Sequence, residues 1–419
     1  MNQASKRQEL WVDLAWAIGY LALYILFDWV SFIHPYAGLD ITPWNPPAGI
    51  SLAFLLRRGL RFSPLLLLVA PLSDVIVRGV NNPWLPTLIA DFIEAGGYIV
   101  GAFLLAKVMK IDPKLSTLHD VLALLAMTTG VSLLTSTGFI QTYHLAGVIP
   151  DGDVASTWFR FWIGDMIGVA IFTPLCLTLG QPALRPNLRN KTSAGIGVLQ
   201  GFAILLALWI AFGGDLAQRP EMYYPLFMPL VWIGAWHGLQ GVTVALFATQ
   251  IGMIVAIQEA HLDTDGLTEV QFFLLALTLT SLLLGAIVTE RRRSRLALRD
   301  SQTRLKAVID VASDGVLTLD EAGQVETVNP AFEWLAGRPA AQMIGCPATA
   351  LFPGLAQALA GRGGKALLER PDGADLWVEL AVGEAVLSDR KIRVASIWHA
   401  NPEREQPASN LTQVATSEH

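Results

Sequence analysis

The chain has 419 residues, of which 53% are hydrophobic and 15% are charged, and its formal net charge is −6. Soluble domains carry about 25% charged residues, so this composition excludes a single soluble enzyme, a secreted disulfide scaffold and a nucleic-acid binder with a basic domain. The charges are also unevenly spread, with 33 Lys, Arg, Asp and Glu in residues 1–290 and 31 in residues 291–419. The sequence therefore predicts a membrane part followed by an ordinary soluble part.

Apolar segments long enough to approach a membrane span, which needs about 20 residues, recur through the first part. They are 11–33, 47–57, 62–80, 86–109, 117–147, 154–180, 195–213, 222–236, 239–259 and 268–290. Because 47–57 and 222–236 are short, we expect eight to ten transmembrane helices. The first segment has no small-residue cleavage site after it, so we interpret it as a retained anchor.

Basic residues cluster in alternate loops. With the N-terminus inside, fifteen of them fall on the inner side: Lys6, Arg7, Arg57, Arg58, Arg61, Lys107, Lys110, Lys114, Arg185, Arg189, Lys191, Arg291, Arg292, Arg293 and Arg295. Only Arg78 and Arg219 fall at or near the other side. This asymmetry predicts that both termini are cytoplasmic.

Polar side chains inside apolar helices are costly and are usually functional. In this topology they gather in the outer halves of their segments, and Asp74 and Arg78 can pair because they are four residues apart. Asp91 and Glu94, three apart, share a helix face. The simplest interpretation is a polar cavity open to the outside, and the alternative is internal pairing that joins helices. The candidate ligand-binding residues are Trp44, Asn45, Asp74, Arg78, Asp91, Glu94, His144, Trp158, Arg160, Trp162 and Asp165.

Several of these candidates have a second interpretation. Trp44 and Trp158 suit an aromatic belt at the membrane surface as well as a ligand wall. Arg160 either binds an anion or pairs with a nearby acid. We expect Pro46, Pro47 and Gly49 to break helix geometry and to free backbone groups that need a protein or water partner.

A short internal similarity links two turns. Arg58-Gly59-Leu60-Arg61 resembles His237-Gly238-Leu239-Gln240, and each precedes an apolar run. Four residues in a sequence of such simple composition are no more than chance would give.

Three blocks carry a family resemblance. They are Trp44-Asn45-Pro46-Pro47-Ala48-Gly49, Asp91-Phe92-Ile93-Glu94-Ala95, and Trp158-Phe159-Arg160-Phe161-Trp162-Ile163-Gly164-Asp165. Their set and order resemble the bacterial membrane-associated sensor domains of the MASE type, over about residues 10–290. The resemblance implies a sensory domain in the bacterial inner membrane, with about eight spans, placed before a histidine kinase or a cyclic-di-nucleotide enzyme. Asp91 departs from the motif, where Asn is expected, so the charge at this position is less transferable. The residues that match the family's motifs are Trp44, Pro47, Gly49, Glu94, Trp162, Gly164 and Asp165.

The last apolar segment continues into a charged helix. Neither Gly nor Pro interrupts 286–313, so one helix is expected to run to about Ala312. Leu298 and Leu305 are seven apart, which favours a short parallel coiled coil and hence a homodimer, although an unpaired amphipathic helix fits nearly as well. We assign 1–290 to the membrane domain and 291–312 to this signalling helix.

The following segment changes to a strand pattern. Strands are predicted at 316–319, 325–328, near 364–370, 375–383 and 390–398. Ala312-Ser313-Asp314-Gly315-Val316, Asn329-Pro330-Ala331-Phe332, Met343-Ile344-Gly345 and Arg370-Pro371-Asp372-Gly373 resemble a PAS domain over 300–399. The resemblance implies an α+β fold with a five-stranded antiparallel sheet. Cys346 and His399 do not sit in cofactor-binding settings, so we expect no cofactor.

Residues 400–419 are polar and are predicted to be disordered. We expect no catalytic residues and no metal site, because no phosphate-binding loop, Cys/His cluster or kinase or cyclase motif is present. The sequence as a whole predicts a non-enzymatic inner-membrane sensor. Its cytoplasmic PAS domain would act on a separate histidine kinase or cyclic-di-nucleotide enzyme, with a small-molecule ligand and no nucleic acid. The alternatives are the input half of a truncated sensor enzyme and a transporter with a regulatory PAS domain.

Overall fold

The computed structural model describes residues 3–32, 44–79, 83–179, 191–213, 220–260, 264–387 and 390–400. The chain divides into two compact units, Met1–Ser294 and Arg295–His419. The first unit is helical and the second contains a β-sheet. Residues 400–419 are predicted to be disordered, and all of them except Ala400 lie outside the described ranges.

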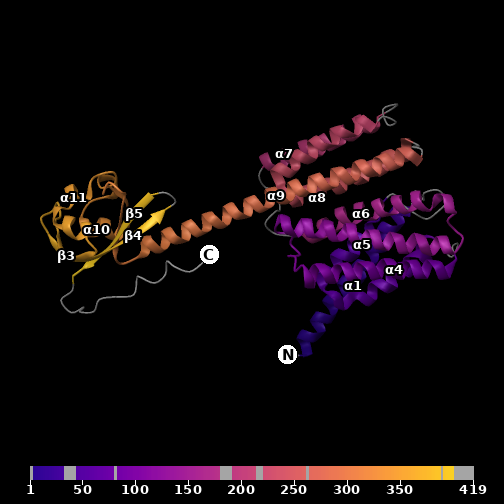
Figure 1. The fold of residues 1–419 in the computed structure, drawn as a ribbon, viewed down its shortest axis with the longest axis horizontal. Coiled ribbons are helices and arrows are strands. Elements are labelled where there is room, and N and C mark those ends of the chain that lie inside the picture. The colour runs from indigo at the N-terminus through magenta and orange to yellow at the C-terminus, as the bar shows by residue number, and fades with distance from the viewer. Residues whose placement is uncertain are drawn as a thin grey trace. The chain divides into compact units, whose positions relative to one another are not determined.

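Long apolar helices build the first unit. They are α1 (Gln3–Phe32), α2 (Pro46–Arg58), α3 (Ser63–Val77), α4 (Trp84–Phe103), α5 (Leu118–Leu145), α6 (Val154–Thr178), α7 (Lys191–Phe212), α8 (Phe227–Ala260) and α9 (Thr264–Val311). Among the described residues, eight helices are long and apolar enough to cross a membrane. The exception is α2, whose 13 residues span about 20 Å, less than the hydrocarbon thickness of about 30 Å. Figure 1 shows α4, α5 and α6 running side by side.

Helix α8 is bent back on itself at Gly238, where φ is 67°. A Cβ at Gly234 would lie 2.9 Å from a methyl group of Val242, and one at Gly241 would lie 3.2 Å from Ile233. Residues eight apart on a straight helix are separated by about 12 Å, so the two halves of α8 are antiparallel arms. The arms correspond to the separately predicted segments 222–236 and 239–259.

Side-chain contacts give each helix its direction. Asp13 near the start of α1 pairs with Arg58 and Arg61, whereas Asp28 near its end pairs with Arg78. Leu118 at the start of α5 donates to Glu290 of α9. The described basic residues predicted to be cytoplasmic thus share one end of the unit, which we call the basic end. They include Arg7, Arg57, Arg58, Arg61, Lys107, Lys110, Lys114 and Arg291–Arg293.

Both four-residue segments that resemble each other lie at the basic end as reversals of the chain. Gly59 between α2 and α3 has a φ of 97°, and Gly238 between the arms of α8 has a φ of 67°. Glycine adopts such conformations without steric cost. Each of the two segments therefore coincides with a helix reversal at a glycine of positive φ.

Helix α2 lies at the centre of the unit and packs closely along α6. A Cβ at Gly49 would approach the carbonyl oxygen of Gly168 to 2.6 Å, and a Cβ at Gly168 would collide with the backbone of Asn45. Small residues permit such close approach of membrane helices. The expectation that Pro46, Pro47 and Gly49 break a helix was wrong. The two prolines begin α2, where no backbone donor is needed, and Gly49 is the contact point.

The second unit has a five-stranded antiparallel sheet in the order β2-β1-β5-β4-β3. The strands are β1 (Gly315–Leu319), β2 (Val325–Val328), β3 (Gly363–Leu368), β4 (Leu376–Leu387) and β5 (Arg390–His399). Short helices α10 (Pro330–Ala336), α11 (Ala348–Leu351) and α12 (Ala356–Ala360) pack with the sheet around Phe332 and Phe352. The five strands predicted from the sequence are all present, and β4 extends four residues past its predicted end.

Asn329 joins helix α9 to this sheet. Its side-chain amide donates to the carbonyl oxygens of Ile309 (3.0 Å) and Asp314 (2.9 Å). Its side-chain oxygen accepts from the backbone amides of Val316 (2.8 Å) and Phe332 (2.9 Å). One buried residue therefore ties the last turn of α9, the start of β1 and the N-terminus of α10 together.

We predict that Gly168→Val strongly destabilises the membrane unit, because the added side chain collides with the backbone of Asn45 and α2 cannot withdraw from a packed core. The loss should be about 3 kcal/mol or more in the free energy of unfolding. It can be measured by SDS-induced unfolding of the purified full chain. The matched control is Gly201→Ala, at an exposed helical glycine with open space. Equal stability of the two variants would contradict the packing argument.

Candidate functional site

A cluster of polar side chains lies at the centre of the helical unit. The Asn45 side-chain nitrogen donates to Glu94 Oε1 at 2.6 Å and to Asp165 Oδ1 at 3.0 Å. The backbone amide of Asn45 also donates to the carbonyl oxygen of Gly164 at 3.1 Å. One amide thereby connects α2, α4 and α6. We call Asn45, Glu94 and Asp165 the central cluster.

The remaining oxygen of Asp165 receives hydroxyl donors from two other helices. Tyr98 of α4 donates to Asp165 Oδ2, and Thr135 of α5 lies 3.4 Å from the same atom. Asp165 is 1% exposed. Among the described residues neither acid of the central cluster has an ion pair, so hydrogen-bond donors alone offset the cost of burying these carboxyl groups.

A second group of charged residues lies nearer the end opposite the basic end. Arg78 pairs with Asp28 at 2.7 Å and also with Asp74, four residues earlier, as the spacing predicts. Ser73 donates to Asp28 at 2.6 Å. These bonds connect α1 and α3.

A cavity of about 190 Å³ adjoins this group. Asp74, Arg78 and Asp91 line it together with Trp84 and Thr87. We call it the outer cavity. Among the described lining residues, two acids accompany one arginine, so the formal charge of this lining is negative, which suits a ligand that carries a positive group.

Asp91 is the unsatisfied group of the outer cavity. Its side chain is 6% exposed, and its Oδ2 atom has no hydrogen-bond partner within the described part of the chain. A buried carboxylate oxygen without a donor is costly, so in native proteins such an atom usually has a partner, which can be a water, an ion or a ligand. A donor supplied by a bound molecule would satisfy it.

The candidate residues predicted from the sequence thus fall into three places. Asn45, Glu94 and Asp165 form the central cluster, whereas Asp74, Arg78 and Asp91 line the outer cavity. Asp91 and Glu94 both point inward from α4, as their shared face predicts, but they lie in separate polar regions. The sequence predicts one polar cavity open to the outside, whereas the structure has two distinct polar regions.

The other candidates lie elsewhere. Trp44 is 1% exposed and packs on Phe172, so it belongs to the core rather than to a surface belt. Trp158 stacks on Trp162 and donates to Thr137 at 2.9 Å. Both rings are only partly buried.

Arg160 and His144 make local contacts away from both polar regions. Arg160 donates to the Thr268 hydroxyl of α9 at 3.1 Å. His144 contacts the carbonyl oxygen of Ile149 at 3.1 Å and lies 3.5 Å from Asp151. These contacts tie helix ends and a loop together.

Sequence reasoning missed Tyr98, Thr135, Trp84 and Thr87. Tyr98 follows Glu94 by four residues, so helix periodicity could have placed it on the same face. Thr135 carries no such signal, because hydroxyl residues are common in membrane helices. The described residues contain no group of three or more His, Cys, Asp or Glu that could hold a metal ion.

A polytopic helical membrane domain followed by a five-stranded sheet of PAS type defines the class of this protein. The MASE1 family model matches residues 14–292, and the PAS fold model matches residues 309–405. The chain belongs to the MASE1 family and carries a PAS domain after its membrane domain. This organisation is that of a signalling sensor. Both matching models describe sensory domains.

Solved structures add similarity to PAS domains. One, from an HTR-like protein of Haloarcula marismortui, is 22% identical, covers 26% of this chain and 99% of that chain, with a TM-score of 0.24. The PAS domain of nitrogen regulation protein NR(II) from Vibrio parahaemolyticus is 19% identical. The match covers 23% of this chain and 97% of that chain, with a TM-score of 0.20. A PAS domain from a two-component sensor histidine kinase is 15% identical. The match covers 26% of this chain and 99% of that chain, with a TM-score of 0.21. No curated protein sequence matches this chain.

We predict that Asn45→Ala lowers the free energy of unfolding by about 2 kcal/mol or more, because Glu94 and Asp165 lose their shared donor. Adding Glu94→Gln should recover part of the loss, since the amide removes a carboxylate and can donate to Asp165. The measurement is SDS-induced unfolding of the purified full chain, arranged as a double-mutant cycle.

The control for this cycle is Ser156→Ala, an exposed change expected to alter stability by no more than about 0.5 kcal/mol. If the effects of Asn45→Ala and Glu94→Gln simply add, the three residues do not act as one hydrogen-bonded unit.

Proposed function

We propose that this chain is an inner-membrane sensor in which a small amine-bearing ligand, such as an amino acid or peptide, binds in the outer cavity. Binding biases the membrane helices, and α9 relays the change to a cytoplasmic PAS domain. The PAS domain then acts on a separate histidine kinase or cyclic-di-nucleotide enzyme. The observation that carries the proposal is the buried carboxyl group of Asp91, whose Oδ2 atom has no hydrogen-bond partner among the described residues, beside Asp74 and Arg78 in the outer cavity.

The chemistry of the outer cavity favours a zwitterion or a cation. Asp91 supplies an acceptor for a protonated amine, while Arg78 and Asp74 remain close enough to contact a second polar group. Trp84 offers an aromatic face on the same cavity, and cations are attracted to such faces. A neutral analogue of the amine would leave Asp91 without a charge partner.

The orientation follows from the charge asymmetry. The described basic clusters share one end of the helical unit, which supports placing that end in the cytoplasm. The outer cavity then lies in the outer half of the membrane. Both termini would be cytoplasmic.

Helix α9 is the proposed relay. It is a single helix from Thr264 to Val311. Inside the membrane unit its Thr289 hydroxyl accepts from the backbone amide of Leu239 at 2.8 Å, next to the reversal in α8. In the second unit Asn329 holds its final turn to β1 and α10. A shift or rotation of α9 would therefore reach the PAS sheet through defined hydrogen bonds.

We further propose that the sensor is a homodimer through this helix. Leu298, Leu305 and Val308 are 60%, 62% and 64% exposed. They recur at intervals of seven and three residues, the spacing of a two-stranded coiled coil. Pairing of two copies would cover these side chains.

The output partner can be identified by affinity capture of a chromosomally tagged full-length protein from native membranes, followed by mass spectrometry. Stoichiometric recovery of a kinase or cyclic-di-nucleotide enzyme supports the proposal. Recovery of a longer bait that itself carries such an enzyme domain would contradict a separate partner. A bait with no signalling companion would favour transport instead.

The orientation predicts a labelling pattern for single cysteines placed in a background with Cys176→Ser and Cys346→Ser. The variant Gly152→Cys should react with a membrane-impermeant maleimide in intact cells, because the exposed loop between α5 and α6 lies at the outer end. One at Lys114→Cys should react only after permeabilisation, because it lies at the basic end. The reverse pattern would contradict the orientation.

The ligand proposal predicts selective stabilisation of the purified full chain by amines. A panel of amino acids and short peptides, each paired with its N-acetylated form, is screened by thermal unfolding in detergent. At least one free amine should raise Tm while its acetylated form does not. Asp91→Asn should weaken that binding by about tenfold or more, because a charge-assisted hydrogen bond is lost.

The matched control is Glu269→Gln, an exposed acid on α9 at the same end of the unit, which should bind as the unmodified protein does. If acetylated and free amines stabilise the protein equally, or if Asp91→Asn binds normally, the outer cavity does not recognise an amine.

A further inference from the structure

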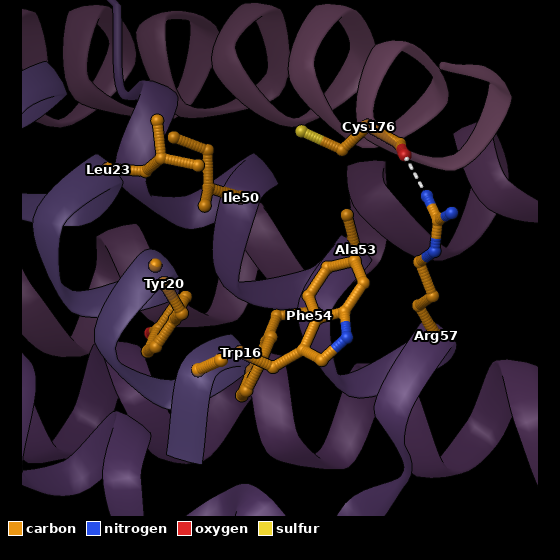
Figure 2. Close-up of a pocket in the computed structure, with 10 residues that line it drawn as sticks. Trp16, Tyr20, Leu23, Ile50, Ala53, Phe54, Arg57 and Cys176 are labelled. Atoms are coloured by element: carbon orange, nitrogen blue, oxygen red, sulfur yellow. Dashed lines mark hydrogen bonds between the residues drawn. The ribbon is translucent and has the colours of Figure 1, made fainter. Parts of the chain in front are cut away.

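A second cavity lies at the other end of the membrane unit, near the basic end. It measures about 260 Å³ and is lined from α1, α2 and α6. Figure 2 shows the side chains that line it, among them Trp16, Tyr20 and Leu23 of α1 and Ile50, Ala53 and Phe54 of α2. We call it the inner cavity. It shares no lining residue with the outer cavity.

The walls of the inner cavity are apolar and ordered. Tyr20 stacks on Phe54 with ring centroids 4.4 Å apart. The Tyr20 hydroxyl is already satisfied, because it shares a hydrogen bond of 2.8 Å with Ser51. An apolar cavity of about 150 Å³ stays dry and can bind benzene, so this larger space favours hydrocarbon over water.

The inner cavity opens toward the lipid along α1. Trp16 and Leu23, which line it, are 39% and 45% exposed. Only 6% of the residues in the apolar window of α1 are buried. Hydrocarbon can therefore enter sideways from the bilayer between α1 and α2.

Positive charge lies at the mouth of the cavity that is nearer the basic end. Arg57 donates to the carbonyl oxygens of Cys176 (3.0 Å) and Leu179 (3.5 Å), and its guanidinium lies 5.3 Å from the centre of the Trp16 ring. Figure 2 shows the bond to Cys176. Next to Arg57, Arg58 lies 5.4 Å from the centre of the same Trp16 ring, and Arg58 and Arg61 share one acid, Asp13. Positive charge is therefore in excess near this mouth of the cavity.

We propose that the inner cavity binds an anionic phospholipid of the cytoplasmic leaflet, with one acyl chain between α1 and α2 and the phosphate on Arg57. An apolar slot below a cationic rim matches an acyl chain below an anionic headgroup. Arginine suits this role, because its planar group can hold the carbonyl oxygens of α6 and a phosphate at once. This site is separate from the outer cavity, so it stands whether or not that cavity binds an amine.

The test is native mass spectrometry of the purified full chain, delipidated and then titrated with phosphatidylglycerol or, separately, with phosphatidylcholine of the same acyl chains. The protein should retain phosphatidylglycerol preferentially. Arg57→Gln should reduce this retention by about fivefold, the contribution of one basic residue at a membrane surface, and leave phosphatidylcholine binding unchanged. Arg57→Lys should restore part of the preference.

Two further variants separate binding from general effects. Ala53→Trp fills the inner cavity and should abolish retention of the lipid. Lys107→Gln removes an exposed charge at the same end of the unit, outside the cavity, and should change nothing. Thermal unfolding of each variant shows whether it remains folded.

Several results would overturn the proposal. They are equal retention of the two lipids, normal phosphatidylglycerol retention by folded Arg57→Gln or Ala53→Trp, and co-purification of a fatty acid or another neutral or anionic small molecule that phosphatidylglycerol fails to displace.

Discussion

The buried amide of Asn45 is the interaction on which the membrane unit depends. It lies between two carboxyl groups, and it brings α2, α4 and α6 to the same point. Lipid offers no water to satisfy such groups, so each polar atom in a membrane interior needs a protein partner. The hydroxyl groups of Tyr98 and Thr135 complete the set from the flanking helices. Removing one member would leave the others unsatisfied, which constrains the positions of four helices at once.

The shortness of α2 is a consequence of this arrangement. A helix that begins with Asn45 before it and two prolines at its start has its N-terminus beside Glu94 and Asp165. The partial positive charge of a helix N-terminus favours nearby acids. Gly49 and Gly168 then allow α2 and α6 to approach closely enough for the amide to reach both carboxyl groups. A full-length span in this place would put its end at the membrane surface, away from the cluster.

The proposed signal and the proposed lipid act on different helices of the same membrane unit. The outer cavity lies between α3 and α4, whereas the inner cavity lies between α1, α2 and α6. Helix α9 contacts the starts of α5 and α6 and the reversal in α8. A ligand that prefers one arrangement of these helices would shift α9 by its differential affinity alone. Asn329 then couples the last turn of α9 to the sheet of the PAS domain.

The sequence by itself determined the two-part organisation, the segments of the membrane domain, the continuous helix to Val311 and the five strands. These follow from hydropathy, breaks in period and helix interruption, which are local properties. It also singled out Asn45, Glu94, Asp165, Asp74, Arg78 and Asp91 as polar residues that a membrane would penalise. Only the tertiary structure decided how they divide into a satisfied cluster and an unsatisfied cavity. The tertiary structure also places Trp44 in the core and makes Tyr98 a hydrogen-bond donor to Asp165 of the central cluster. Helices packed side by side bring distant residues within hydrogen-bond reach, and no spacing along one helix specifies which neighbour it will face.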